Sequence, residues 1–451
     1  MTTDGRLQFW LLVWVVTAAY ILVRHWRTGR GAGLVFTYVL SLAAIHWLAA
    51  AIYALPWYST QEFDTTLDGL RVSAIALMAF GVGGEIGGLV FGRFGPALPN
   101  TVTPPRADPR IVNTYIVAGV IFYSVIFPIV AALPTASALA STSSSLVVLG
   151  VGLKAWNAWY QGRPSGTWLW LAATAAFPFV TLVGQGFLGF GFAAMLVVAA
   201  FVASFYRPRW QVVAAGALVA YLGLSIYVTY MRDRRDIREV VWGGESLGSR
   251  VGRLTETFTE MEWFDLNNIE HLHRIDDRLN QDALVGMAVD SIRSGAVPLA
   301  RGATIEDAAI ALIPRALWPA KPVVAGSGDL VADYTGLVVP EGTSVGIGHV
   351  MECYVNFATP GIVLGFVLIG AVTVYVDRSA STWLHRGDVS KFAIWFLPGL
   401  SVLQVGGSFV EMMSTGAAAL VVAMVCARVA ARFAGPMAPA QTPPVVAADH
   451  P

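Results

Sequence analysis

The stretch from Leu7 to Val23, LQFWLLVWVVTAAYILV, decides the fold class. It contains no charged residue, and as a helix with its flanking residues it can cross a hydrocarbon core of roughly 30 Å. Arg6 is the only basic residue before this run, and a basic segment from Arg24 to Arg30 follows it. No small-residue cleavage site ends it. We therefore interpret it as a retained membrane span and not as a cleaved signal peptide.

The composition extends this interpretation to the whole chain. Of its 451 residues, 56% are hydrophobic and 13% are charged, and the mean hydropathy is +0.62. An all-α polytopic membrane protein with about eleven transmembrane helices is the prediction that follows. The further apolar runs that can span a bilayer are Leu34 to Leu55, Leu70 to Phe91, Ile111 to Leu133, Ala138 to Trp156, Thr167 to Val183, Gly186 to Phe205, Gln211 to Met231, Gly361 to Val376, Phe392 to Phe409 and Ser414 to Ala431.

Basic residues in the short connections predict the orientation of these spans. Outside residues 232–360, nearly all of them fall on alternate connections and on the C-terminal side, and only Arg6 and Arg71 fall on the other. Cytoplasmic connections carry the excess of lysine and arginine. We therefore expect the N-terminus outside the membrane and the C-terminus in the cytoplasm.

One large polar segment, residues 232–360, lies between the eighth and ninth spans, and the span count puts it outside the cytoplasm. It should form a helical extracytoplasmic domain between an N-terminal bundle at 1–231 and C-terminal helices at 361–433, with a disordered tail at 434–451. Apolar residues at helical spacing and capping residues predict its helices. These are Val251 to Met261, Ile269 to Leu279, a helix capped by Asn280 to Asp282 that runs through Arg293, and Ile305 to Ile313 with Thr304 and Asp307 as a capping-box-like start.

A proline-rich stretch, Ile313 to Pro322, ends this predicted domain and reads IPRALWPAKP. Its prolines fix φ and remove backbone donors, so neither a helix nor a central strand can pass through it. Arg315 and Lys321 flank Trp318, whose face can stack on a sugar ring or anchor the loop. A stiff cationic loop of this kind suits an anionic ligand that contains a ring, and the alternative is a structural plug that seats the domain on the bundle.

Other motifs are few. The sequence contains no Walker A motif, no strand-linked Rossmann fingerprint and no zinc-ligand spacing, so we expect no cofactor and no metal. It also lacks the basic cluster of a nucleic-acid binder. The glycines from Gly81 to Gly88 favour close helix packing, and His271 with His273 is more typical of a surface helix than of a metal site.

Two glutamates in or near apolar runs and the two cysteines are the remaining features of note. Glu85 and Glu411, inside or near apolar runs, are either functional carboxylates or carboxylates paired at a helix end. Cys353 and Cys426 fall in different predicted regions, so we expect no disulfide between them.

The segment from Ile313 to Gly361 resembles a known family. It contains Ile313-Pro-Arg-Ala-Leu-Trp-Pro-Ala-Lys-Pro322, then Thr343-Ser344, then Glu352-Cys-Tyr-Val-Asn-Phe357, with Gly361 opening a span. With its many helices and one long outer loop, the chain resembles the bacterial oligosaccharide repeat-unit polymerases, or O-antigen polymerases. The close resemblance covers about fifty residues. It departs from the usual pattern at Ala320 and Ala358, where an acidic residue and a glycine are more common.

The resemblance implies a GT-C-like glycosyltransferase of the bacterial cytoplasmic membrane that uses no sugar nucleotide. It would transfer a growing glycan from undecaprenyl pyrophosphate to a sugar hydroxyl of another lipid-linked repeat unit. Its partners would be these lipid-linked oligosaccharides, the bilayer, a chain-length regulator and a flippase, and no nucleic acid.

The chemistry of that reaction selects candidate residues. The departing pyrophosphate needs cations, for which Arg315 offers a bidentate fork and Lys321 a point charge. The cluster Arg232, Arg234 and Arg235 could contribute at headgroup depth or could meet anionic lipid.

The acceptor hydroxyl needs a base, and His349 and Glu352 lie three residues apart. A satisfied loop histidine and an ion pair of Glu352 with Arg315 are the structural alternatives. Asn356 could hold a sugar hydroxyl or cap the ninth span, and Trp318 could stack on a sugar.

Three other functions remain open from the sequence. An O-antigen ligase would use the same donor with another acceptor. A lipid or solute transporter would show inverted repeats and paired broken helices, which are not evident. A structural partner in an envelope assembly would have no convergent cationic site.

Overall fold

The computed structural model describes residues 3–97, 106–130, 134–206, 210–313, 318, 320–322, 324–339 and 345–433. This part of the chain is all-helical, with 81% helix and no strand. The elements in chain order are α1 (Thr3–Thr28), α2 (Leu34–Leu42), π-helical η1 (Ala43–Trp47), α3 (Leu48–Ile52), α4 (Phe63–Phe94), α5 (Pro109–Ile121), π-helical η2 (Phe122–Ile126), α6 (Phe127–Val130), α7 (Pro134–Tyr160), α8 (Pro164–Ala173), η3 (Thr174–Ala176), α9 (Phe177–Gln185), α10 (Leu188–Phe205), α11 (Trp210–Trp242), α12 (Leu247–Thr259), α13 (Ile269–Leu279), α14 (Gln281–Arg293), α15 (Ala303–Ala311), α16 (Ser327–Thr335), α17 (Gly348–His385), α18 (Val389–Val402) and α19 (Phe409–Phe433).

Nine helical segments of the described chain are long and apolar enough to cross a membrane, which confirms the predicted all-α membrane fold in outline. They coincide with nine of the predicted runs. The other two runs fall on α7 and on α18, a shorter apolar helix. The nine segments are Gly5–Thr28, Leu34–Ile52, Phe63–Phe94, Pro109–Ile129, Pro164–Gln185, Leu188–Phe205, Ala214–Trp242, Gly348–His385 and Phe409–Val429.

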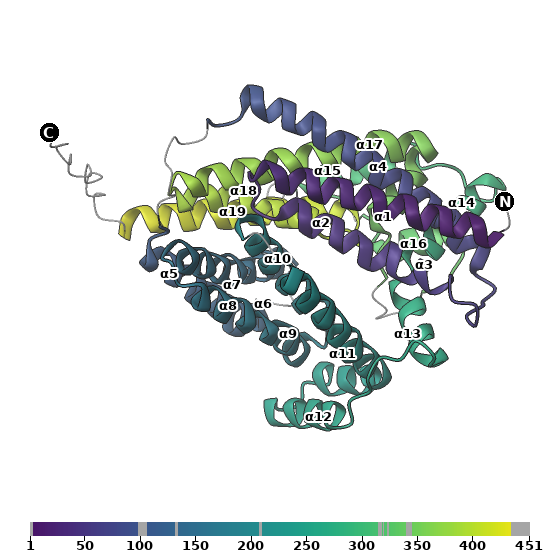
Figure 1. Cartoon of the computed structure of the whole chain (residues 1–451), viewed down its shortest axis with the longest axis horizontal. Helices are drawn as coiled ribbons and strands as arrows, with labels where there is room; N and C mark the ends of the chain where they lie inside the picture. The colour runs from purple at the N-terminus through teal and green to yellow at the C-terminus, as the bar shows by residue number, and fades with distance from the viewer. Residues whose placement is uncertain are drawn as a thin grey trace, which may run out of the picture.

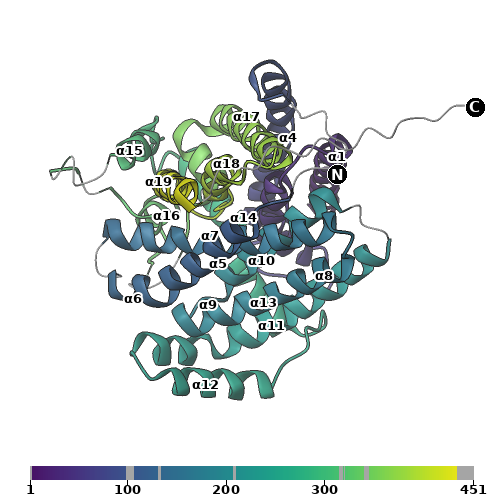
Figure 2. The ribbon, with the colours of Figure 1, turned by 90° about the vertical axis from the view of Figure 1, so that its left-hand side faces the viewer.

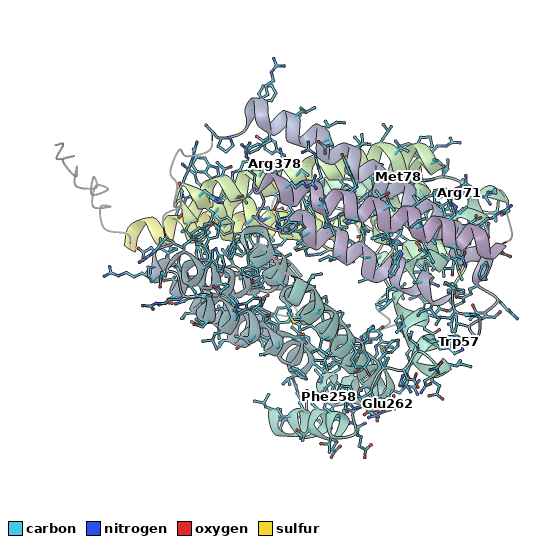
Figure 3. The ribbon with its side chains drawn as sticks, viewed as in Figure 1. Trp57, Arg71, Met78, Phe258, Glu262 and Arg378 are labelled. Carbon is cyan, nitrogen blue, oxygen red and sulfur yellow. The ribbon has the colours of Figure 1, made fainter. Side chains whose placement is uncertain are left out.

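The bundle has two ends that carry different elements (Figure 1). The N-terminus, α13, α14 and α16 lie at one end, which we call the loop end. The C-terminus of α19 and the start of α5 lie at the other, which we call the tail end. Arg71 and Arg378 mark the two directions along the α4 and α17 pair (Figure 3). The elements that carry candidate site residues are concentrated at the loop end.

Glycines bring α4 into close contact with α17 and α14. A Cβ added to Gly83 would overlap the carbonyl of Val367, and one added to Gly370 would overlap the carbonyl of Phe80. A Cβ on Gly286 would likewise overlap the carbonyl of Thr65. The interpretation of the α4 glycines as packing residues is therefore confirmed, and the same device attaches α14 to the membrane bundle.

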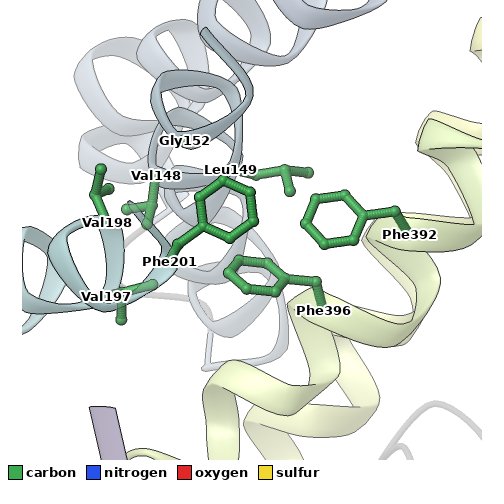
Figure 4. Close-up of a pocket in the computed structure, with 8 residues that line it drawn as sticks. All are labelled: Val148, Leu149, Gly152, Val197, Val198, Phe201, Phe392 and Phe396. Carbon is green, nitrogen blue, oxygen red and sulfur yellow. The ribbon is translucent and has the colours of Figure 1, made fainter. Parts of the chain in front are cut away.

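A second group of helices, α5 to α10, packs beside the first group (Figures 1 and 2). Its contact with α18 is made by the rings of Phe201, Phe392 and Phe396, with centroids 5.0 to 6.0 Å apart. A small apolar pocket there is too narrow for a water molecule (Figure 4). Its walls are Val148, Leu149, Gly152, Val197, Val198, Phe201, Phe392 and Phe396.

The helices predicted within residues 232–360 are largely confirmed. Helices α12, α13 and α14 match three of them, and Asn280 caps α14 by accepting from Ala283 N. The predicted cap at Thr304 is wrong, because α15 begins two residues earlier, after Gly302 in left-handed geometry with φ 97°. Helix α16 was not predicted from its Gly-rich surroundings.

One boundary near the C-terminus also differs from the sequence-based expectation. The predicted run Phe392 to Phe409 ends as a helix at Val402, because Gly406 and Gly407 form a turn. Helix α19 then starts at Phe409, where Ser408 and Glu411 cap each other's backbone N–H groups.

Candidate functional site

Helix α17 is broken where the sequence contains Pro360. Proline has no N–H to donate to the carbonyl of Asn356, four residues earlier. The backbone leaves helical geometry at Phe357 (φ −143°, ψ 24°) and Ala358 (φ 52°, ψ −142°). Left-handed φ is unfavourable for alanine, so packing around the break must hold it there.

The loop before α15 satisfies the carbonyl groups that this break exposes. Ala300 N donates to Val355 O at 2.9 Å, and Arg301 N donates to Asn356 O at 3.1 Å. The Asn356 side chain accepts from Gly302 N at 2.9 Å. The fully buried Asn356 thus joins the loop to the break.

His349 lies on the N-terminal half of α17 and is fully buried. Its Nδ1 is 3.2 Å from the hydroxyl of Tyr38, whose ring stacks on Phe80 with centroids 4.6 Å apart. The imidazole also packs against Phe409, at 5.6 Å between centroids. Its Nε2 has no hydrogen-bond partner among the described residues.

Glu352 is one turn further along and is also fully buried. Its Oε2 accepts from Phe409 N at 2.6 Å, so it holds the first turn of α19. Its Oε1 has no partner in the described chain. The nearby Thr304 hydroxyl accepts from Asn356 Nδ2 at 2.7 Å. A buried carboxylate oxygen without a donor is costly, which marks this position as unusual.

A second buried pair joins α14 to η1. His46 Nδ1 lies 2.6 Å from Asp282 Oδ1, and both side chains are almost completely inaccessible. Burial raises the pKa of Asp282, and the nearby His46 offsets part of that effect. Together with His349 and Glu352 this pair forms what we call the buried polar core. His46 sits in a π-helical turn, a feature that is frequent at functional positions.

Arg232, predicted to bind substrate, is fully engaged within the protein. It donates to Asp233 at 2.8 Å and to Glu262 at 3.1 Å. Glu262 also receives Arg274 at 2.6 Å and contacts His271 at 3.2 Å. Figure 3 shows Glu262 near Phe258, beside α12. Arg232 therefore fastens residues 260–274 to α11.

Three other arginines gather nearby without such partners, and we call them the arginine cluster: Arg234, Arg238 and Arg278. Arg234 and Arg238 are four residues apart on α11 and share a face, and Arg278 comes from α13. Their guanidinium groups repel one another, and none forms an ion pair with a carboxylate of the described chain. Burial and the Arg234 charge lower the pKa of Arg278.

Aromatic rings hold Arg238 in this position. Its guanidinium lies 4.5 Å from the centre of the Phe187 ring and 5.1 Å from that of Trp242. Tyr230 donates to Gly186 O at 3.0 Å and fixes the turn that carries Phe187. Exposed Arg235, also predicted from sequence, continues the positive surface without an ion pair among the described residues. Sequence reasoning missed Arg238 because it lies outside the basic group Arg232 to Arg235. It missed Arg278 because that residue is about forty positions further along the chain.

The proline-rich stretch is only partly described. Arg315 lies outside the described residues. Trp318 is 38% exposed, and Lys321 Nζ donates to Ala311 O at 3.1 Å and to Ile313 O at 3.0 Å. Lys321 thus caps the C-terminal end of α15, a favourable place for a cation. His349, Glu352 and Asn356 are brought together on α17, whereas Arg232 and Lys321 are fixed on other elements.

Several remaining sequence features have structural roles. Glu85 pairs with Arg24 at 2.9 Å, and Glu411 belongs to the α19 cap. Cys353 and Cys426 are free, as expected. No group of His, Cys, Asp and Glu in the described chain is arranged to hold a metal, and His271 contacts Glu262.

A third buried pair lies toward the tail end. Asp377 accepts from Ala32 N at 2.9 Å and Leu34 N at 2.8 Å and contacts His25 at 2.7 Å. Its carboxylate holds the start of α2 against α17. This pair was not predicted, although an aspartate directly after an apolar run is a visible signal.

Comparisons with protein-family models, with curated proteins and with solved structures find no match to this chain.

Proposed function

We propose that the protein is a membrane glycosyltransferase that polymerises undecaprenyl-pyrophosphate-linked oligosaccharide repeat units. The reaction would take place at the loop end, on the outer face of the bacterial cytoplasmic membrane, in a GT-C-like bundle. The resemblance of residues 313–361 to the O-antigen polymerases motivates the proposal. The helical, apolar-rich fold is compatible with it.

The arginine cluster is the observation that carries the proposal furthest. Polymerisation releases a lipid pyrophosphate, and the developing negative charge must be stabilised close to the membrane surface. Arg234 and Arg238 lie in the last turns of the spanning segment Ala214–Trp242, and Arg278 lies on α13. None of the three forms an ion pair with a carboxylate of the described chain, and Asp277 offsets only part of the charge of Arg278. Guanidinium groups bind phosphate oxygens in a bidentate way. An unpaired group of them fits a polyanionic headgroup better than any neutral substrate.

The buried polar core would supply the base. Glu352 and His349 each keep one polar atom without a partner, on the half of α17 that precedes the break. Both are fully buried, so the acceptor hydroxyl can reach them only after a movement. The break at Phe357 and Ala358 gives the short N-terminal half a point at which to hinge. Arg315 keeps the pyrophosphate-binding role that the resemblance implies.

A ligase-type transferase is the nearest rival, since the arginine cluster suits the same donor. A transporter is less well supported. Transporter sites use paired broken helices, whereas α17 is the helix of the described chain with non-helical residues inside it.

Glycolipids that accumulate when the protein is depleted test the class of reaction. We expect a single repeat unit on undecaprenyl pyrophosphate. Long polymer left on its carrier would favour the ligase, and unchanged glycolipids would overturn both.

Variants test the residues. Arg234→Gln combined with Arg278→Gln should shorten the glycan while the protein level is kept, whereas Arg253→Gln, which removes an arginine paired with Asp236 at 2.8 Å, should leave chain length unchanged. Arg315→Lys should also lose most polymer if the fork geometry is used. Full-length glycan from both variants would remove the cationic site from the proposal.

Thiol labelling tests the orientation. A cysteine at Val338, which is 91% exposed, should react with an impermeant reagent added outside intact cells. A cysteine at Arg428 on α19 is the matched control and should react only after the membrane is opened. The reverse pattern would contradict an active site on the outer face.

A further inference from the structure

A crevice separates α5 from α19 at the tail end of the bundle. Both helices pack against α7, and between them lies a cavity of about 190 Å³. Its walls come from membrane-spanning segments, so it faces the lipid phase rather than bulk water. We call it the α5–α19 crevice. It is distinct from the buried polar core and from the arginine cluster.

Polarity changes in a regular order along this crevice. Exposed Asp108 and Arg110 stand at its mouth, at the start of α5. Tyr115 follows about 7 to 8 Å deeper along the helix axis, at 1.5 Å per residue from Arg110. Ala118 and Phe122 continue the same face with apolar surface only. Thr114 also lines the crevice, but its hydroxyl donates to Arg110 O at 2.9 Å. The order is charge, then the hydroxyls of Thr114 and Tyr115, then hydrocarbon.

The hydroxyl of Tyr115 is the unusual group in this series. The residue is 1% exposed, and its Oη lies near the side chain of Ser390 without forming a hydrogen bond of normal geometry within the described chain. Burying a hydroxyl without a hydrogen bond is unfavourable in free energy, and an acceptor atom of a ligand in the crevice would remove this cost. Its depth below Arg110 is the depth at which an ester carbonyl follows the phosphate of a glycerolipid.

The charges at the mouth indicate the kind of headgroup. Arg110 forms no ion pair among the described residues, and so its guanidinium is free for a phosphate. Asp108 uses one oxygen to cap α5 by accepting from Arg110 N at 2.8 Å. Its carboxylate remains exposed beside the arginine. A headgroup that contains both a phosphate and a primary ammonium, which can donate hydrogen bonds to the carboxylate, matches this pair. A quaternary ammonium has no N–H to donate, and a purely anionic headgroup matches only half of the pair.

We propose that the α5–α19 crevice binds one glycerophospholipid of the phosphatidylethanolamine kind. Its phosphate contacts Arg110, its ammonium contacts Asp108, an ester carbonyl accepts from Tyr115, and one acyl chain runs past Phe122. The proposal stands on its own, whether or not the protein is a glycosyltransferase.

Cys426 provides a reporter inside the crevice. It lines the cavity beside Val425 and Val429, whereas the other cysteine, Cys353, is 4% exposed. Bimane attached to Cys426 in nanodiscs would be quenched by brominated lipids. Brominated phosphatidylethanolamine, phosphatidylglycerol and phosphatidylcholine are each titrated into unlabelled lipid.

We expect brominated phosphatidylethanolamine to quench at roughly fivefold lower mole fraction than the other two, near the upper end for exposed ion pairs. Asp108→Asn should remove its advantage over phosphatidylglycerol, and Arg110→Gln should weaken all binding at this site. Tyr115→Phe should weaken binding without changing the order of the lipids. As a control, bimane at a cysteine placed at Val117, 56% exposed on the outer face of α5, should report all lipids equally in a Cys426→Ser background.

Equal quenching by the three lipids at Cys426 would overturn the proposal. Preference for phosphatidylglycerol would contradict the role given to Asp108 and hence the proposed headgroup. If bimane itself blocks the crevice, native mass spectrometry of the unlabelled protein gives the same comparison, and absence of a retained phosphatidylethanolamine would then count against binding.

Discussion

The buried polar core and the arginine cluster are both rich in polar groups, but they differ in how those groups are paired. In the core, His46 and Asp282 face each other at 2.6 Å and Glu352 holds Phe409 N at the same distance. In the cluster, Arg234, Arg238 and Arg278 repel one another and form no ion pair with a carboxylate of the described chain, and Asp277 offsets only part of the charge of Arg278. The contrast separates polar groups that join helices to one another from cations that, under the proposed function, would bind a pyrophosphate.

The largest effect should come from removing Asp282. Asp282→Ala leaves His46 buried without its partner, and losing half of a buried pair costs about 3–5 kcal/mol. We expect a large drop in unfolding free energy, measured by denaturant titration in detergent micelles. The double variant His46→Leu with Asp282→Leu should recover much of the loss, because the remaining site is apolar. A small effect of Asp282→Ala would remove the core's structural role.

The arginine cluster should behave in the opposite way. Arg278→Gln should leave the unfolding free energy unchanged or slightly raised, since it relieves repulsion. The same change should weaken binding of inorganic pyrophosphate by about tenfold or more, the loss of one charged hydrogen bond. Melting temperature with and without pyrophosphate measures both quantities. Loss of stability without loss of binding would place Arg278 among the structural groups.

A smaller change tests how closely the core helices pack. Gly83→Ala puts a Cβ against the carbonyl of Val367 and should destabilise by about 1–3 kcal/mol. Gly92→Ala on the same helix meets no atom within 4 Å and should be neutral or slightly stabilising. The pair of melting curves shows the difference directly. Equal curves would mean that α4 and α17 can move apart freely.

The smallest effect concerns Glu262, the acid that fastens residues 260–274 to α11. Burial alone would raise its pKa, but hydrogen bonds from Arg274, Arg232 and His271 lower the pKa overall. A lowered carboxylate pKa stabilises above the unfolded value of about 4.3 and loses that contribution as pH falls further. Glu262 and its arginine partners are partly exposed, so their ion pairs contribute at most about 1 kcal/mol to the unfolding free energy. The difference in melting temperature between wild type and Glu262→Gln should shrink below about pH 4.

Sequence reasoning reached the helices more easily than the contacts. Apolar runs of bilayer length, the helical spacing of apolar residues in 251–261 and 269–279, and the cap at Asn280 are local signals, and the helices they predict are present. The pair of His46 and Asp282 joins segments far apart in the chain, so no local pattern contains it. His46 inside an apolar run was nevertheless a visible signal, because an ionisable group in a span needs a partner.

The candidate site was predictable only in part. His349 and Glu352 share one half-helix, as their three-residue spacing indicated, and Asn356 lies on the same half-helix. Their burial depends on Tyr38, Phe409 and the loop at Gly302. Arg278 joins the arginine cluster only because α13 packs near α11. Residue type identified the chemistry, while tertiary packing decided which cations remained without a partner.

The glycine contact between α4 and α17 also determines when, during synthesis of the protein, these two helices can pack. Val367 emerges from the ribosome roughly 280 residues after Gly83, which is tens of seconds at about 5–20 residues per second. During that interval the grooved face of α4 must wait in the bilayer against lipid tails. Lipid tolerates such a face because it exposes no unsatisfied backbone group. The packing of α4 against α17 therefore forms only after α4 has been inserted into the membrane. A chain interrupted before α17 would have its earlier helices inserted but could not form this contact.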